Sequence, residues 1–180
     1  MWSPPTSLCI NNLDHLYKLH RRAGPERAVK LLCQTGQKQT QNYICKMEAF
    51  FGNWKLVSSE NFEEYMRAKG FVEEEVEVGN IVTPVTSIYQ DGEKVVIKLK
   101  TSISSSENSF VLGEEFDDNM ISKPTRSVVN LEGGKLVQTW KWDDKTSILT
   151  REIQDGKMIL TLSYDDTVAV RTYEKISEAD

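Results

Sequence analysis

Two polar side chains alternate on the last strand-like stretch of the chain, Val168 to Glu174. Successive side chains of a strand point to opposite faces, so Arg171 and Tyr173 share one face. For this strand alone, the simpler interpretation is a solvated arginine beside an edge aromatic. If both side chains face a protein interior instead, they present hydrogen-bond donors that suit a carboxylate.

The two preceding strand-like stretches predict what surrounds this pair. Turn residues at 155–156 and 165–166 favour antiparallel hairpins, and pairing across them aligns the inward faces of three strands. The predicted inward neighbours are Leu149, Arg151, Leu160 and Leu162. Because a buried arginine without a partner is costly, two arginines in an aliphatic interior imply an anion or ordered water. A slip of one residue in register would invert these faces.

The length and composition of the chain limit the classes of protein to which it can belong. The 180 residues, 39% hydrophobic and 27% charged, suffice for one domain with a sizeable core. Residues 1–46 carry seven basic and two acidic residues, which gives this segment a net charge of +5. Because the whole chain has a net charge of −5, residues 47–180 have a net charge of −10. An acidic main body argues against a nucleic-acid partner. We interpret residues 1–46 as a largely disordered basic extension and residues 47–180 as the folded module.

The distribution of cysteine and histidine limits the chemistry further. All three cysteines and both histidines precede Met47. The main body therefore lacks Ser-His and Cys-His nucleophile pairs and the common zinc ligands. It cannot form a disulfide, as expected in a reducing compartment. We expect no enzymatic activity, no metal and no cofactor, and no apolar run is long enough to span a membrane.

Two helices are predicted between a first strand and the remaining strands. The segment 61–69 has an apolar stripe made by Phe62, Tyr65 and Met66, with Ser59 or Asn61 as its expected cap. A second helical stretch follows at 72–82.

After position 84, short strands alternate with turn residues at about ten-residue spacing. One such turn is expected at 104–107, before a strand at 109–112. The pattern predicts a mainly β fold, a ten-stranded antiparallel up-and-down β-barrel of lipocalin-like type, with a two-helix lid at about 61–82. Ten strands leave room for an interior cavity.

Six separated segments, in order along residues 47–180, carry a family resemblance. They are 52–66, 82–84, 110–117, 131–136, 141–142 and 171–175. With these segments the chain resembles the intracellular lipid-binding proteins, the cytosolic fatty acid-binding and retinoid-binding family. It is most similar to the heart, adipocyte, myelin and testis subgroup. The resemblance does not extend to residues 1–46.

The resemblance implies a monomeric, non-enzymatic carrier that binds long-chain fatty acids reversibly, in the cytoplasm and, as a second compartment, the nucleus. In the family, the ligand carboxylate is held by a terminal Arg-x-Tyr and an arginine two strands earlier, which match Arg171, Tyr173 and Arg151. Retention of both arginines favours an acid over retinol, so a retinoic acid-binding protein is the nearest alternative. An extracellular lipocalin-like carrier or an enzyme is the third.

The remaining candidate contacts belong to the lid and the cavity wall; plain core packing is the alternative for most of them, and for Trp140 it is an ordinary core or outer aromatic. They are Phe62, Tyr65, Met66, Val76, Pro84, Ile103, Trp140, Leu149, Leu160 and Leu162. Trp140 narrows the cavity if it faces inward.

Two features depart from the family pattern. The second helix carries four glutamates where relatives are usually basic, so we expect only transient and weak contact with anionic membranes. The turn at 119–125 is shorter than usual, which affects the portal through which ligand enters.

Overall fold

The structure is a computed structural model, and it describes residues 46–118, 120 and 124–177. These residues fall in the unit Lys46–Asp180. The predictions for residues 1–45, and most of the predicted turn at 119–125, lie outside the described residues.

Two helices and ten strands lie between Gly52 and Ile176. The helices are α3 (Phe62–Ala68) and α4 (Glu73–Ile81). The strands are β1 (Gly52–Glu60), β2 (Val85–Asp91), β3 (Lys94–Lys100), β4 (Ser105–Phe110), β5 (Glu115–Asp118), β6 (Thr125–Glu132), β7 (Lys135–Trp142), β8 (Lys145–Gln154), β9 (Lys157–Tyr164) and β10 (Thr167–Ile176).

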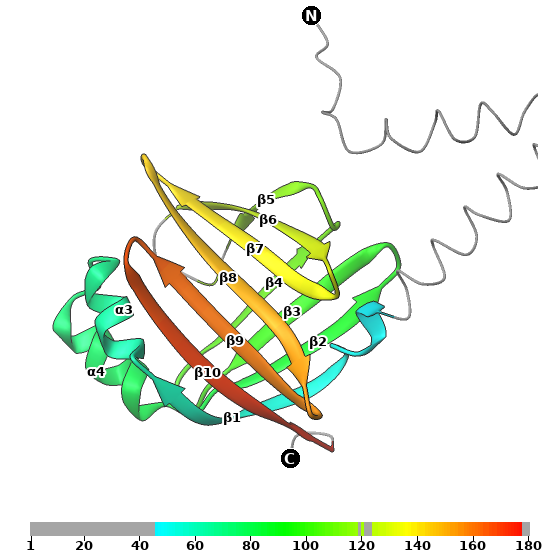
Figure 1. Cartoon of the computed structure of the whole chain (residues 1–180), viewed down its shortest axis with the longest axis horizontal. Helices are drawn as coiled ribbons and strands as arrows, with labels where there is room; N and C mark the ends of the chain where they lie inside the picture. The colour runs from blue at the N-terminus through cyan, green and yellow to red at the C-terminus, as the bar shows by residue number, and fades with distance from the viewer. Residues whose placement is uncertain (1–45, 119, 121–123, 178–180) are drawn as a thin grey trace, which may run out of the picture. The chain divides into compact units, whose positions relative to one another are not determined.

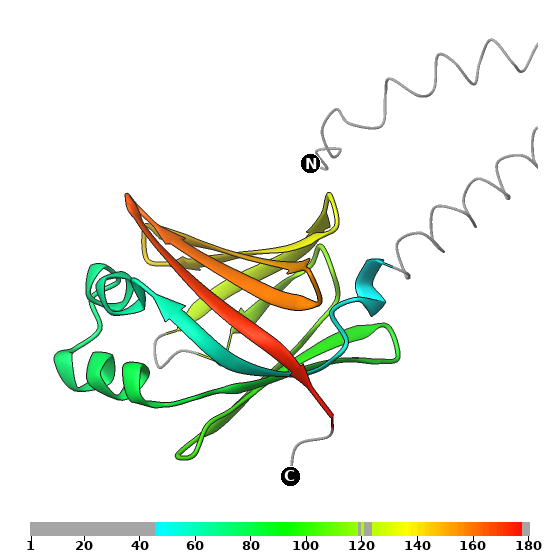
Figure 2. The same cartoon turned by 60° about the horizontal axis from the view of Figure 1, so that its bottom comes forward.

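The strands form one antiparallel sheet in the order β4-β3-β2-β1-β10-β9-β8-β7-β6-β5. Most strands pair with the next strand in the sequence, the first strand also pairs with the last, and β4 and β5 are the two ends of the order, so the sheet curves into a nearly closed barrel. Figures 1 and 2 show β2–β4 lying opposite β7–β9, with α3 and α4 together at one end of the barrel. The prediction of a ten-stranded antiparallel barrel is confirmed.

Aspartates set three of the hairpin turns. Asp143, Asp155 and Asp165 have φ angles of 48°, 50° and 48°, a left-handed conformation that aspartate tolerates better than most side chains. The turn predicted at 104–107 is wrong, because β4 already begins at Ser105. Pairing of 105–110 with β3 supplies ladder hydrogen bonds that outweigh the local turn preference of the serines.

Backbone conformation and backbone hydrogen bonds, rather than a side-chain cap, define the two ends of helix α3. Of the two predicted caps, Asn61 occupies the N-cap position, but its side chain makes no cap hydrogen bond and instead donates from Nδ2 to Val168 O on β10 at 2.8 Å. At the other end, Gly70 has φ +83°, and its N–H donates to Arg67 O at 2.9 Å. The chain then turns into α4.

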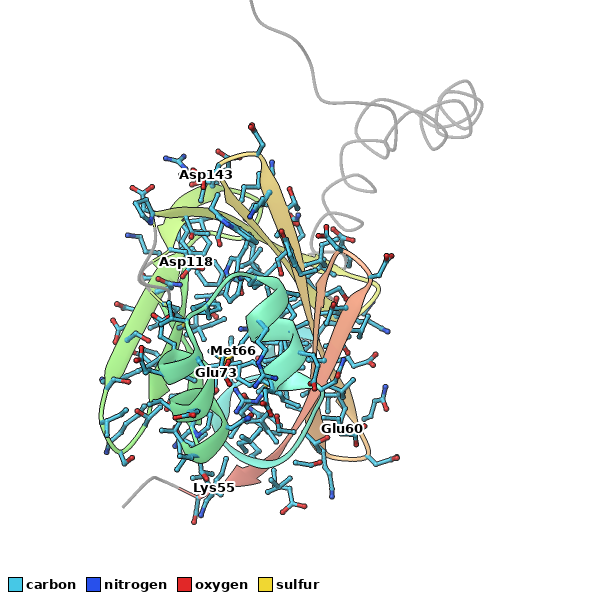
Figure 3. The ribbon with its side chains drawn as sticks, turned by 90° about the vertical axis from the view of Figure 1, so that its left-hand side faces the viewer. Lys55, Glu60, Met66, Glu73, Asp118 and Asp143 are labelled. Atoms are coloured by element: carbon cyan, nitrogen blue, oxygen red, sulfur yellow. The ribbon has the colours of Figure 1, made fainter. Side chains whose placement is uncertain are left out.

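The two helices pack closely against each other. A Cβ placed on Gly79 of α4 would lie 2.7 Å from Met66 Sδ of α3, so the helices meet at a residue without a side chain. Figure 3 looks onto this pair, with Met66 and Glu73 labelled. The lid predicted at about 61–82 therefore matches α3, the turn at Gly70 and α4.

Candidate functional site

A cavity of about 230 Å³ lies inside the barrel beneath α3. Ten predicted residues line it: Phe62, Tyr65, Met66, Trp140, Leu149, Arg151, Leu160, Leu162, Arg171 and Tyr173. Seven further lining residues were not predicted: Lys69, Phe71, Thr86, Ile97, Leu99, Met120 and Met158. The wall is mostly apolar, which suits a hydrocarbon chain, and its few polar groups are cationic or hydroxyl-bearing.

Neighbouring strands bring the two arginines and the tyrosine together. Arg171 on β10 pairs with Leu160 on β9, and Leu160 pairs with Arg151 on β8. These residues form one row across the wall, and Tyr173 follows two positions after Arg171 on the same face. Three residues far apart in sequence therefore face one cavity. Their role as ligands for a carboxylate stays a prediction at this point.

Both guanidinium groups are withdrawn from water, with 5% of Arg151 and 8% of Arg171 exposed. Burial lowers the pKa of both groups. Each keeps a buried Nε–H that makes no hydrogen bond to a described residue. Arg171 lies against the lid, with its Cζ 4.0 Å from the ring centre of Phe62. Buried cations with unused donors are costly, and an anion placed between them would reduce that cost.

Tyr173 adds a neutral donor to the pair. It is 2% exposed, and burial raises the pKa of its phenol although Arg171 and Arg151 oppose that shift. Its side chain also shares a hydrogen bond with Thr86. At physiological pH the phenol therefore keeps its proton and offers a hydroxyl rather than a second charge.

A polar network that the sequence analysis missed holds Arg151 from behind. Arg151 Nη1 donates to Gln138 Oε1 at 2.9 Å, and Gln138 Nε2 donates to Asp118 Oδ2 at 2.9 Å. The amide of Gln138 thus has a fixed orientation, with its oxygen toward the cation and its nitrogen toward the carboxylate. This arrangement positions Arg151 without using its Nε.

Asp118 is the centre of that network. It is 4% exposed, and four further groups donate to its carboxylate besides the glutamine amide. They are Asn108 Nδ2 at 2.7 Å, the Met120 N–H at 2.9 Å, Ser127 Oγ at 2.9 Å and Trp140 Nε1 at 2.7 Å. A buried carboxylate that accepts five hydrogen bonds is compensated for the loss of water. Figure 3 labels Asp118 at the edge of the barrel.

Three predicted wall and lid residues do not line the cavity. Ile103 is 69% exposed, because it lies in the loop between β3 and β4. Val76 is 0% exposed but belongs to the packed core beneath the helices. Pro84 is buried at the start of β2, where its carbonyl accepts the N–H of Leu56 at 3.1 Å. Val76 and Pro84 are therefore buried outside the cavity lining.

Trp140 does face inward. It lines the cavity, and its indole N–H is held by Asp118 at 2.7 Å, so the ring has a defined orientation. Selection of slim ligand chains by this ring remains a prediction.

The described residues contain no group of three or more His, Cys, Asp and Glu arranged as a metal site. Nor does any helix in the described segments have the length and apolar character needed to cross a membrane.

Comparison with known families decides the identity of the fold. The family model for the lipocalin / cytosolic fatty-acid binding protein family matches residues 51–176. The chain belongs to this family. The match covers the entire barrel and both helices, so the described fold and the family assignment agree.

Several solved structures resemble this family member closely. A Schistosoma mansoni fatty acid binding protein in complex with arachidonic acid is 32% identical, with a TM-score of 0.70, over 73% of this chain and 99% of that chain. The fluorescent protein UnaG is 42% identical, with a TM-score of 0.67, over 72% and 98%. A brain fatty acid-binding protein of Drosophila melanogaster is 33% identical, with a TM-score of 0.65, over 69% and 98%.

In this fatty-acid binding protein family member, a buried hydrogen bond fastens the lid to the barrel. Ser147 Oγ lies 2.8 Å from the Tyr65 hydroxyl and donates to Ser163 O at 2.9 Å. Because Ser147 donates its hydroxyl proton to the carbonyl of Ser163, it can only accept from Tyr65, so the Tyr65 hydroxyl is the donor. Burial raises the pKa of Tyr65 to about 12, although its hydrogen bond with Ser147 acts in the opposite direction.

The raised pKa of Tyr65 predicts an alkaline loss of stability. Folding raises this pKa above its ordinary value of 10.0, so the stabilising contribution is complete below that pH and is lost as pH rises toward about 12. Tyr65→Phe should reduce this slope and cost about 1 kcal/mol at neutral pH through the lost hydrogen bond. Urea unfolding across this pH range measures both effects.

Tyr89, an exposed tyrosine of β2 (42% exposed), provides the matched control. Tyr89→Phe should keep both the neutral stability and the alkaline slope of the parent protein. An unchanged slope in Tyr65→Phe would contradict the assignment to Tyr65.

Proposed function

We propose that this chain is a non-enzymatic carrier that binds a long-chain fatty acid reversibly inside the barrel. The carboxylate is held by Arg151, Arg171 and Tyr173, and the hydrocarbon chain lies along the aliphatic and aromatic wall. One observation carries the proposal: two buried guanidinium groups with unused Nε–H donors border a cavity that is otherwise mainly apolar. A carboxylate accepts from both groups at once.

Chain burial supplies most of the affinity in this proposal, at roughly 25 cal/mol for each Å² of apolar surface removed from water. The arginines supply orientation and selection, because much of their attraction is offset by desolvation of the carboxylate. The likeness to a fatty acid binding protein in complex with arachidonic acid supports a fatty acid as the ligand class.

Retinoic acid is the competing ligand class, since it carries the same head group. A fluorescent fatty-acid analogue bound to the full chain, displaced in parallel by oleate and by retinoic acid, separates the two. We expect oleate to displace the analogue at the lower concentration. Tighter displacement by retinoic acid would favour the retinoid alternative, and failure of both ligands on folded protein would refute a carrier of lipid acids.

We further propose a cytoplasmic monomer that meets anionic membranes only transiently and weakly. The observation behind the last point is the first turn of α4, where Glu73, Glu74 and Glu75 lie exposed on the lid. Figure 3 places Glu73 on the face of the helices that is turned to the viewer. A negative lid surface is repelled by anionic lipid head groups.

A further inference from the structure

An aromatic ring of the lid lies over one arginine of the carboxylate site. Phe62, the first residue of α3, has its ring centre 4.0 Å from Arg171 Cζ on β10. This separation leaves no room for an N–H between the carbon and the ring, so the guanidinium lies along the ring face. The N–H groups of a guanidinium lie in its plane and therefore point past a ring stacked on it. The ring covers one face of the cation and leaves its donors to a carboxylate.

Contacts on both sides of Phe62 along the chain hold its ring in this place. Asn61 Nδ2 donates to Val168 O at 2.8 Å, which ties the residue before Phe62 to β10. Tyr65, about one helical turn later, shares a hydrogen bond of 2.8 Å with Ser147 on β8. The ring of Tyr65 stacks on that of Phe62, with ring centres 6.1 Å apart. These contacts attach the ring to the two strands that carry the arginines of the site.

The second lid helix packs against the same ring. A Cβ placed on Gly79 of α4 would lie 3.4 Å from Phe62 Cε1, so the ring lies close to the backbone of that helix. The ring therefore contacts both α4 and the Arg171 guanidinium. A ring face attracts a cation, and the attraction strengthens where water is excluded.

The two arginines of the site are thus positioned by different means. Gln138 Oε1 accepts a hydrogen bond of 2.9 Å from Arg151, whereas Phe62 covers Arg171 from the lid. An arginine with fewer orientations open to it loses less conformational entropy when a carboxylate binds. An uncharged head group gains less from the same orientation, because its hydrogen bonds to a guanidinium are weaker than those of a carboxylate.

We propose that Phe62 is a positioning residue for head-group recognition, so that selection of an acid over an alcohol depends on the closed lid. The ring acts through Arg171, because it fixes the plane of the guanidinium and keeps one of its faces dry. This inference rests on the proposed function, since it uses Arg171 as a ligand of the carboxylate. It adds the lid to a head-group site whose other members lie on the barrel wall.

Titration of the full-length protein with oleate and with oleyl alcohol tests this role, because the two ligands differ in the head group. We expect the ratio of the oleyl alcohol Kd to the oleate Kd to fall about fivefold in Phe62→Leu, equivalent to about 1 kcal/mol. Phe62→Tyr keeps the ring and should keep the parent ratio. Phe116→Leu is the matched control and should also keep it. Phe116 is likewise half-buried, but its ring stacks on Phe110 at 4.7 Å and does not line the cavity.

The outcomes separate this proposal from the carrier function. An unchanged ratio in Phe62→Leu overturns the positioning role, and a parallel loss of affinity for both ligands would make Phe62 a contact of the hydrocarbon chain alone. A fall in the ratio that Phe62→Tyr shares overturns the role of the ring. Failure of both ligands to bind folded parent protein overturns the carrier function itself.

A second variant decides if Phe62→Leu does not fold. Asn61→Gly frees the lid from β10 at an exposed residue with φ 57°, a conformation that glycine adopts without strain. A lower ratio in Asn61→Gly supports the positioning role, and an unchanged ratio overturns it.

Discussion

Arg171→Gln should weaken oleate binding by about tenfold to a hundredfold and leave the ligand-free protein at least as stable as the parent. The affinity loss corresponds to hydrogen bonds to a charged group, about 1.5 to 3 kcal/mol. Stability should not fall in parallel, because the substitution removes a buried cation whose Nε–H makes no hydrogen bond to a described residue. The lost contact with the Phe62 ring offsets only part of this gain.

Titration with oleate and with oleyl alcohol, beside urea unfolding of the ligand-free protein, measures these effects separately. The alcohol should bind the variant about as well as the parent, so discrimination between acid and alcohol should decrease. Arg126→Gln is the control, since Arg126 has 56% of its side chain exposed and pairs with Glu115 and Asp117 on the surface. Unchanged oleate affinity in Arg171→Gln would refute the proposed clamp. Equal losses of stability and of affinity for both ligands would indicate general damage instead.

Asp118→Ala should lower the free energy of unfolding by about 3 to 5 kcal/mol, the range for removing one partner from a buried charged network. Five donors lose their common acceptor, among them the amide of Gln138 that orients Arg151. Freed from Asp118, this amide no longer has a fixed orientation, so oleate affinity should fall as well. Urea denaturation gives the first effect, and calorimetric titration of the folded fraction gives the second.

The neighbouring residue offers a close control for this substitution. Asp117 lies on the same strand, but its side chain is 82% exposed and pairs only with surface Arg126 at 3.3 Å among the interactions of the described residues. Asp117→Ala should change the free energy of unfolding by no more than about 0.5 kcal/mol. Similar losses in both variants would mean that the buried hydrogen bonds of Asp118 contribute little.

Strand periodicity and turn residues together predicted most of the barrel and much of its interior. Alternation placed Arg171 and Tyr173 on one face, and hairpin turns placed Leu160 and Arg151 beside them. Those inferences needed only the pairing of strands that are consecutive in the sequence, and the short turns between these strands restrict their register. The same logic failed at 104–107, where local serine preference conflicts with pairing to β3.

Residues whose surroundings come from distant segments were not predictable in this way. Lys69 resembles an ordinary basic residue near a helix end, and Asp118 ends an acidic run that suggests a surface strand. Gln138 gave no signal beyond its place on the inward face of β7. Each acquires its environment from elements that pair or pack only after the barrel closes, as the donors to Asp118 from β4, β6 and β7 illustrate.

The sequence by itself therefore determined the class of fold, the family resemblance and the fact that Arg171 and Tyr173 share one face of their strand, because side-chain alternation and turn chemistry are local properties. Only the tertiary structure decided which groups meet inside: the network that positions Arg151 and the lid ring that lies over Arg171. Ile103, which the sequence predicted as a wall residue, shows the same limit, since it lies exposed in the loop between β3 and β4. Burial and hydrogen-bond partnership depend on closure of the sheet, and closure depends on the pairing of β1 with β10, segments about a hundred residues apart.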